Sequence, residues 1–288
     1  MTSTRSWRGL TFGGDSPFQI TQEDGLEGSE VRSGVRNLPR LHGATPGSHF
    51  AEPRIIVLEL NWAADTPAAA QTLTDQLLAV TGPSETSLYE YGIVGSDLTE
   101  RMVRGRVSRR VLPRDQASEA VGSLKGRLVF ECPDPRIYSP EPTGIVVPEF
   151  DIGGEGFDWV VDWPVDAAEP TVSYGTAVNT GNSDAYPLIR FAAAVEVGQV
   201  TLTNLTNGAV LDIQTTIAIG QTLTCDMDAL IRVTGDPIIH ISGASRFADW
   251  QTPRIPFALA PGTNTLTFTH DGTAGDVTCR VDWRHTSL

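Results

Sequence analysis

Hydrophobic and polar residues alternate along most of the second half of the chain, which is the pattern of β-strands with one buried face. The alternation is clear over residues 188–192 and again over 200–205. Between that second run and the next stands Asn207-Gly208, a signal for a two-residue turn because both residue types tolerate positive φ. We therefore predict a hairpin whose second strand covers residues 209–213.

The end of the chain carries the same signature. Pro261-Gly262 marks a turn, after which Leu266 and Phe268 alternate with threonines. In the last predicted strand, residues 277–283, every second position is apolar. These strands together predict a β-sandwich, because each has one face to bury and turn residues to separate it from the next.

The first half of the chain contains one strong strand signal and one helix signal. Residues 54–62 form a near-continuous run of aliphatic and β-branched side chains, which favours a strand. Asp65 or Thr66 can cap a helix whose first turn contains Pro67, where the missing N–H costs nothing. Apolar residues at helical spacing follow until a Gly-Pro pair ends the pattern: Ala70, Leu73, Leu77 and Val80. We predict this as the only substantial helix, with its apolar side packed on a sheet.

Segments rich in Gly and Pro divide the remaining pattern. Residues 24–50 hold few apolar residues among several glycines, which is more typical of an extended arm or long hairpin than of a core. Further strands are predicted over residues 87–91, 101–112 and 126–132. A stretch rich in Pro and Gly follows and indicates a domain junction. The predicted organisation is an N-terminal domain over 1–142, a junction over 143–165 and the sandwich over 166–288.

Length, charge and cysteine content limit the class of protein. A chain of 288 residues exceeds the usual size of one domain. The net charge of −14 argues against a protein that binds nucleic acid by neutralising phosphates. Residues 1–150 hold 15 Arg and Lys against 19 Asp and Glu, and residues 151–288 hold 6 against 16, so the net charges are −4 and −10. That difference supports two units with different roles.

Cysteines and hydropathy indicate a soluble intracellular product. The three cysteines are far apart and odd in number, so neither a disulfide framework nor a zinc site is indicated. No apolar run reaches membrane-spanning length, and the first residues lack the apolar core of a signal peptide. We expect a protein that is made in a cytoplasm and does not enter a membrane.

One predicted strand is unusually rich in arginine. Six arginines fall within residues 101–114 of an otherwise acidic chain. Three interpretations stay open: a solvated strand face, a contact between protomers, and a nucleic-acid site. The lack of interleaved aromatic residues counts against the third. For a protomer contact, the candidate residues are Arg101, Arg104, Arg106, Arg109 and Arg110.

Strand alternation sorts these arginines onto two faces. It places Arg104 and Arg106 together and puts Arg101 and Arg109 on the opposite face, unless a bulge at Gly105 breaks the alternation. A ring contact joins two different surfaces, so the basic face would meet an acidic face of the neighbour. The predicted acidic complement is the region of Glu23, Asp24 and Glu27.

No group of residues predicts catalysis, a cofactor or a metal ion. The glycines from Gly153 to Gly156 lack the lysine and following helix of a phosphate loop, which favours a linker. Asp158 and Asp162 share a strand face, as a glycosidase pair could, but no cleft is indicated. The histidines show no metal-ligand spacing, and no nucleophile motif occurs. We predict that the protein is not an enzyme.

Several short motifs occur in an order and spacing that resemble a known family. They are Asn179-Thr180-Gly181-Asn182, Tyr186-Pro187-Leu188-Ile189, Leu202-Thr203-Asn204, Thr206-Asn207-Gly208 and Leu259-Ala260-Pro261-Gly262-Thr263-Asn264. Together they resemble the galectin-like C-terminal domain of siphophage distal tail proteins. The strand over 126–132, which runs into Pro133-Asp134-Pro135 and Tyr138, is similar to the end of that family's ring-forming domain.

The resemblance implies a mainly β protein, with an N-terminal ring-forming β domain that has one helix and a C-terminal galectin-like β-sandwich. It implies a homohexameric ring at the distal end of a long flexible phage tail, with a contact between protomers near residues 24–50. The ring would join the tail tube protein to the tip hub protein and let DNA pass without binding it. The rival is a carbohydrate-binding module for host-surface glycans, with Trp250 and Trp283 as candidate stacking residues.

Overall fold

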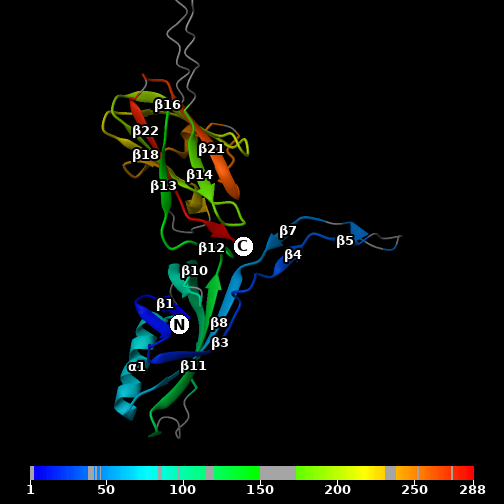
Figure 1. The fold of residues 1–288 in the computed structure, drawn as a ribbon, viewed down its shortest axis with the longest axis vertical. Coiled ribbons are helices and arrows are strands. Elements are labelled where there is room, and N and C mark those ends of the chain that lie inside the picture. The colour runs from blue at the N-terminus through cyan, green and yellow to red at the C-terminus, as the bar shows by residue number, and fades with distance from the viewer. Residues whose placement is uncertain are drawn as a thin grey trace, which may run out of the picture. The chain divides into compact units, whose positions relative to one another are not determined.

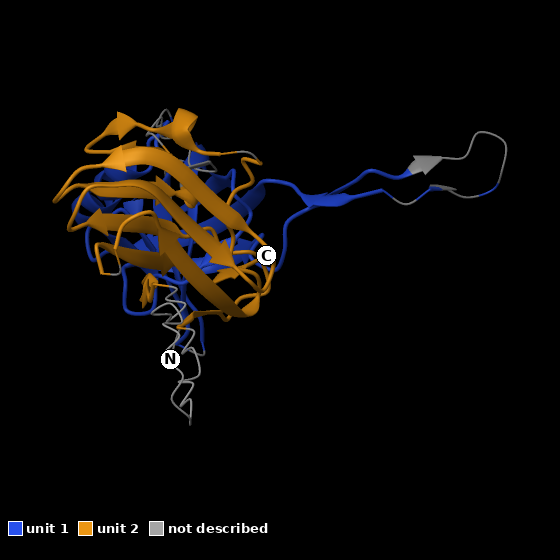
Figure 2. Cartoon of the chain, turned by 90° about the horizontal axis from the view of Figure 1, so that it is seen from above, with its two compact units in different colours: residues 1–140, 288 blue, residues 141–287 orange. Residues whose placement is uncertain are grey.

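The computed structural model describes residues 3–37, 42, 44–45, 47–83, 86–96, 98–113, 120–149, 173–230, 238–251, 253–273 and 275–288. The chain divides into two compact units, residues 1–140 with 288 and residues 141–287 (Figure 2). Strands dominate both units, and the described residues contain a single α-helix (Figure 1). The prediction of a mainly β protein with one helix is therefore confirmed.

Unit 1 is built on an antiparallel sheet with strand order β2-β1-β9-β10-β11-β8-β3, and β12 pairs with β10. The strands of this sheet are β1 (Thr4–Trp7), β2 (Leu10–Gly13), β3 (Phe18–Asp24), β8 (Arg54–Ala63), β9 (Tyr89–Val94), β10 (Glu100–Val111), β11 (Ser123–Cys132) and β12 (Ile137–Tyr138). The predicted aliphatic strand over 54–62 is β8, which lies between β11 and β3.

One face of this sheet and the helix α1 (Pro67–Val80) enclose the core of unit 1. Alternate residues of β8 and β11 meet there, so that Leu58 and Leu128 are direct neighbours and both fully buried. Thr66 is the cap of α1, and its Oγ1 accepts a hydrogen bond from the backbone N–H of Ala69 at 3.2 Å. Leu77 then places the apolar side of α1 against the sheet, as the spacing predicted.

A two-stranded ribbon, here called the arm, lies between β3 and β8 and comprises the described residues 31–37, 42, 44–45 and 47–51. It pairs β4 (Val31–Ser33) with β7 (His49–Ala51), and β5 (Arg36–Asn37) with β6 (Ala44–Thr45). Figures 1 and 2 both show it leaving the sheet of unit 1. The predicted long hairpin is confirmed.

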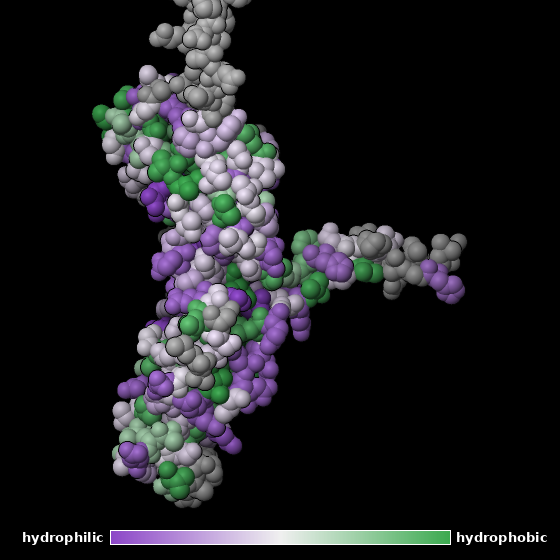
Figure 3. Space-filling view, viewed as in Figure 1, coloured by the Kyte–Doolittle hydropathy of each residue, from purple (hydrophilic) through white to green (hydrophobic). Residues whose placement is uncertain are grey.

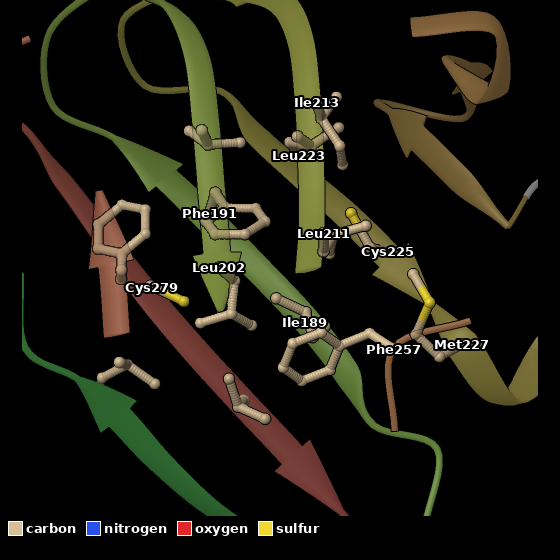
Figure 4. Packing of buried hydrophobic residues seen from close by; sticks show 14 of the residues in the cluster. Ile189, Phe191, Leu202, Leu211, Ile213, Leu223, Cys225, Met227, Phe257 and Cys279 are labelled. Carbon is tan, nitrogen blue, oxygen red and sulfur yellow. The ribbon is translucent and has the colours of Figure 1, made fainter. Parts of the chain in front are cut away.

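Unit 2 is a sandwich of two antiparallel sheets, one with strand order β13-β22-β15-β18-β19-β20 and the other β14-β21-β16-β17. The strands of these sheets are β13 (Thr143–Val147), β14 (Gly175–Asn179), β15 (Leu188–Ala193), β16 (Val197–Asn204), β17 (Val210–Ile217), β18 (Thr222–Asp226), β19 (Ile239–Ile241), β20 (Ala244–Ser245), β21 (Gly262–His270) and β22 (Val277–Trp283), with 3₁₀ turns at Met227–Leu230 and Phe247–Asp249. The short strand β23 (Thr286–Ser287) also falls within unit 2 but is in neither of the two sheets. Phe191, Leu202 and Leu211 project into the core between the sheets (Figure 4).

The hairpin between β16 and β17 differs from its prediction. The two strands are separated by residues 205–209, so the connection is not the two-residue turn that Asn207-Gly208 suggested. Gly208 does have positive φ, at 74°. The side chain of Asn207 instead holds a wider loop, because its amide donates to Ala258 O at 2.9 Å and its Oδ1 accepts from Ala209 N.

The junction predicted over 143–165 contains a strand. Residues 143–147 form β13, which pairs along its full length with β22, and Val147 is buried in the core of unit 2. The remainder of that range, from residue 150, lies outside the described residues, as do Gly153 to Gly156, Asp158 and Asp162. The structure thus begins unit 2 at Glu141.

This strand leads to a prediction about domain fragments. We expect a fragment of residues 141–288 to melt cooperatively and at a higher temperature than one of 166–288. The shorter fragment loses β13 and exposes apolar surface that Ile145 and Val147 cover, at about 1.5–3 kcal/mol for each well-buried side chain. Differential scanning calorimetry of the two fragments tests this, and equal melting temperatures would show that β13 adds nothing to the stability of unit 2.

Candidate assembly surface

The arginines of β10 form two groups because the strand contains a bulge. The register with β11 shifts between Val107 and Arg109, so that Ser108 is an extra residue. Val107 lies opposite the buried Phe130, whereas Arg109 lies opposite Val129 and Arg110 opposite the buried Leu128. Arg109 is therefore on the outer face of the sheet together with Arg106. The predicted placement of Arg109 on the face opposite Arg106 is wrong, since strict alternation does not cross a bulge.

On the core side, Arg110 reaches the end of α1. Its Nη1 donates to the carbonyl oxygens of Leu78 at 3.1 Å and Thr81 at 2.9 Å, and to Thr81 Oγ1 at 3.0 Å. A cation at this position interacts favourably with the unpaired carbonyls and partial negative charge of a helix C-terminus. These contacts give Arg110 a structural role inside unit 1.

On the outer face, Arg106 pairs with Glu131 of the neighbouring strand. Arg106 Nη2 lies 3.0 Å from Glu131 Oε2, and both side chains are about one-third exposed. The guanidinium of Arg104 lies over the ring of Tyr138, 4.9 Å from its centroid. Both arginines are thus held by unit 1 and still reach solvent, as side chains on the rim of an interface do.

Arg101 belongs to a separate feature, a groove of about 670 Å³ over β1, β9 and β10. Arg8 and Tyr89 also line it, with the Arg8 guanidinium 4.2 Å from the centre of the Tyr89 ring. Glu90 and Glu100 add negative charge to the same lining. The five candidate arginines therefore do not form one patch.

The predicted acidic complement is also divided. Glu23 faces inward, where its carboxylate accepts hydrogen bonds from Arg5 Nε at 2.8 Å and from the Tyr91 hydroxyl at 2.8 Å. Burial alone would lower the pKa of Arg5, but the hydrogen bonds and charge of Glu23 outweigh it and raise that pKa. Burial first, and then the Glu23 charge, raise the pKa of Tyr91 well above its ordinary value. Glu23 is therefore occupied within unit 1, and only Asp24 and Glu27 are exposed.

The arm presents apolar and basic side chains to solvent. Val31 and Phe50 are each more than half exposed, and the Arg32 guanidinium lies 5.9 Å from the centre of the Phe50 ring. Figure 3 shows hydrophobic and hydrophilic residues side by side along the described part of the arm. Isolated two-stranded ribbons are marginally stable in water. Contact with a partner that covers these apolar side chains would therefore stabilise the arm.

A buried arginine that the sequence analysis missed secures the base of the arm. Arg54 Nη1 donates to the carbonyl oxygens of Gly25 and Leu26, both at 2.9 Å, and its Nε donates to Pro135 O at 2.9 Å. Burial lowers the pKa of this guanidinium, and nearby acidic groups partly oppose that shift. Nothing in the sequence distinguished Arg54 from the exposed arginines, because its carbonyl partners are remote along the chain.

The tryptophans proposed for sugar stacking lie in the core of unit 2. Trp250 and Trp283 are almost fully buried, Trp250 next to Ile213 through an isolated bridge. Trp283 Nε1 donates to Val178 O at 3.2 Å. Neither ring can stack on a sugar, so these two residues do not support the carbohydrate-binding alternative.

The motifs that carried the family resemblance form a network of buried amides. Asn264 donates from Nδ2 to Ala260 O at 2.8 Å, and its Oδ1 accepts from Ala260 N and Asn204 Nδ2, both at 2.9 Å. Asn179 donates to Ser183 O and Leu259 O and accepts from Gly181 N. In each case the amide side chain hydrogen-bonds to backbone N–H and C=O groups that find no backbone partner in the loop. This explains why these turns need asparagine.

Neither a metal site nor a membrane helix appears in the part of the chain that the structure describes. No group of three or more His, Cys, Asp and Glu side chains there could hold an ion. No described helix is long and apolar enough to cross a membrane.

The three cysteines are buried free thiols, which gives a simple chemical prediction. Burial raises the pKa of Cys132 to about 12 despite the opposing charge of Arg54, and burial also raises the pKa of Cys225 and Cys279. Because the thiolate is the reactive form, we expect no labelling by maleimide at pH 8 in the folded protein and full labelling in urea. Mass spectrometry measures this, and rapid labelling of any one thiol would show that its surroundings open.

The sequence matches no protein-family model and no curated protein. The structure does match solved structures. One is the crystal structure of the Dit (gp 19.1) protein of SPP1, with a TM-score of 0.67 and 14% identity over 100% of both chains. That protein is described as a paradigm of the hub adsorption apparatus in phages that infect Gram-positive bacteria. The chain has the fold of a phage distal tail protein.

Further matches with this distal tail fold come from an assembled particle. The baseplate of phage P2 in its activated conformation contains a chain with a TM-score of 0.54 and 8% identity, covering 98% of this chain and 97% of that one. The same baseplate with strontium gives the same values. In both comparisons the likeness includes both units, because it extends over nearly the full length.

Proposed function

We propose that this chain is the distal tail protein of a long-tailed phage, where six copies form a ring between the tail tube protein and the tip hub protein. The observation that carries the proposal is the likeness to a phage hub protein over the whole length of both chains. A shared fold alone leaves function open, so the surface must also suit assembly. It does, since the arm and the outer face of β10 present apolar and basic groups that unit 1 itself does not bury.

The ring acts through its geometry. One face meets the tube, the other meets the tip hub, and unit 2 offers a mounting surface for further proteins. The assembly belongs at the distal end of the tail in the virion and is made in the host cytoplasm. The test is to purify the full chain, measure its mass by analytical ultracentrifugation and image it by electron microscopy. A particle of six copies with a central channel is expected, and a strict monomer with no affinity for the tube or hub proteins would contradict the proposal.

The channel should let DNA pass without holding it. A chain with net charge −14 lacks the excess of cations whose binding to phosphates releases counterions and makes an association tight. We expect no retention of a DNA duplex by the assembled ring in an electrophoretic shift assay at 50 mM salt. Tight binding that weakens steeply with added salt would contradict both the conduit and the ring.

A further inference from the structure

An aliphatic strip crosses the outer face of the unit 1 sheet. It consists of four β-branched residues on three adjacent strands: Ile55 and Val57 of β8, Val129 of β11 and Val111 of β10. Val57 and Val129 are direct partners across the strands, with Ile55 and Val111 on the diagonals beside Val129. Ile55 is 47% exposed and Val111 38% exposed, so the ends of the strip lie open to solvent.

Charged residues of both signs border this strip. Arg127 lies directly opposite Val111 and pairs with Glu59, which follows Val57 on the same face of β8. On the β10 side, Arg106 pairs with Glu131, and Arg109 is the cross-strand neighbour of Val129. On the β3 side, Asp24 is the cross-strand neighbour of Val57. An apolar centre within a polar rim enriched in arginine is the composition that separates protein interfaces from ordinary surface.

We propose that the aliphatic strip is the centre of the contact with a neighbouring copy of this chain, and that Arg106 and Arg109 form its rim. The inference rests on the ring proposed above and specifies which face of unit 1 closes it. The net charge of −14 favours a second copy as the occupant, because Arg106 and Arg109 reach solvent at the rim and are complementary to the acidic groups that outnumber basic ones in this chain. The opposite face of the same strands packs against the core of unit 1 and α1, so it is not available for a contact with another copy.

The two parts of the contact should respond differently to salt. Exposed ion pairs at a rim weaken as salt screens them, and they act mainly on the rate of association and on specificity. Burial of aliphatic side chains does not weaken with added sodium chloride. A strip at the centre therefore predicts assembly that resists salt, with a salt-sensitive contribution from the arginines.

The experiment removes the aliphatic groups and keeps the shape of the strand. The double variant Ile55→Thr, Val111→Thr replaces two exposed side chains by a β-branched polar residue, so the strand propensity is retained. The matched control is Val178→Thr, Val210→Thr, which replaces two exposed β-branched aliphatic residues by threonine in strands of unit 2. A third variant, Arg106→Glu, Arg109→Glu, reverses the rim. Sedimentation over a concentration series at 50 mM and 500 mM salt gives the assembly constant, and circular dichroism checks the fold.

The strip variant is expected to assemble roughly tenfold more weakly than the parent at both salt concentrations, because two partly exposed aliphatic groups no longer become buried. The control should match the parent, and the rim variant should be weakened mainly at 50 mM salt. If the parent forms six-copy particles and the folded strip variant does so equally well, the strip lies outside the contact while the ring stands. If the parent stays monomeric at every concentration, both the ring and this self-contact are wrong.

Discussion

Replacing Glu23 by Ala is expected to destabilise unit 1 by about 3–5 kcal/mol, since it leaves a buried guanidinium without its carboxylate. The side chains of Arg5 and Glu23 are only 9% and 12% exposed. Arg5 would keep its hydrogen bonds to the carbonyl oxygens of Thr4 and Val94, which satisfy Nη1 but do not neutralise the charge. The Tyr91 hydroxyl would also lose its acceptor.

Hydrogen exchange measured by mass spectrometry is the suitable assay, because it follows peptides of unit 1 separately from those of unit 2. The control is Glu59→Ala, whose carboxylate lies 4.0 Å from Arg127 in a pair that is about half exposed. An exposed pair of this kind contributes about 0–1 kcal/mol, so the control should exchange almost like the parent. Equal protection in the Glu23 and Glu59 variants would show that the buried pair is not needed for stability.

Replacing Asn264 by Ala is expected to destabilise unit 2 by about 3–5 kcal/mol, because it leaves more than one buried polar group unsatisfied and opens a cavity. The amide is fully buried and makes four hydrogen bonds, two as donor and two as acceptor. Its loss leaves Asn204 Nδ2 and Ala260 N without this acceptor, and an unsatisfied buried polar group costs about 1–3 kcal/mol. The substitution also leaves a small cavity at the end of the sandwich.

Urea denaturation of the 141–288 fragment, followed by circular dichroism, measures the change. Thr269→Ala is the control, since it alters an exposed side chain of the same strand. We expect a shift of the unfolding midpoint for the Asn264 variant that is several times larger than for the control. Equal midpoints would mean that the network of amides can be replaced without loss, and that these asparagines serve something other than stability.

The sequence predicted best where one residue's neighbours along the chain decide its environment. Alternation identified β22 with the bounds that the structure has. The capping signal named Asp65 or Thr66 as the start of α1, and the cap in the structure is Thr66. The single helix and the arm were predicted for the same reason. The family motifs were visible because each Asn sits inside a short turn whose composition is local.

The sequence failed where a partner comes from a distant strand. Glu23 and Arg5 are 18 residues apart, and Tyr91 is 68 residues from Glu23, so nothing local marked Glu23 as buried. Trp250 stands in a loop-like sequence and was named as a candidate for sugar stacking, yet it lies in the core beside β17. The β13 strand was assigned to a junction because prolines flank it, although its pairing with β22 at the other end of unit 2 determines its structure.

The bulge in β10 also gives this strand a position that tolerates a change in length. Ser108 is the residue without a cross-strand partner, and its hydroxyl hydrogen-bonds to Val129 O at 3.2 Å. A deletion of Ser108 would join Val107 directly to Arg109 and leave every side chain on its present face. A deletion at Gly105, by contrast, would shift one part of the strand by one residue. The side chains between Gly105 and the bulge, or between Gly105 and the start of the strand, would then point to the opposite face of the sheet. Insertions and deletions that accumulate during evolution are therefore expected to occur mainly at Ser108, because a change in length there leaves the side chains of the paired residues on their present faces.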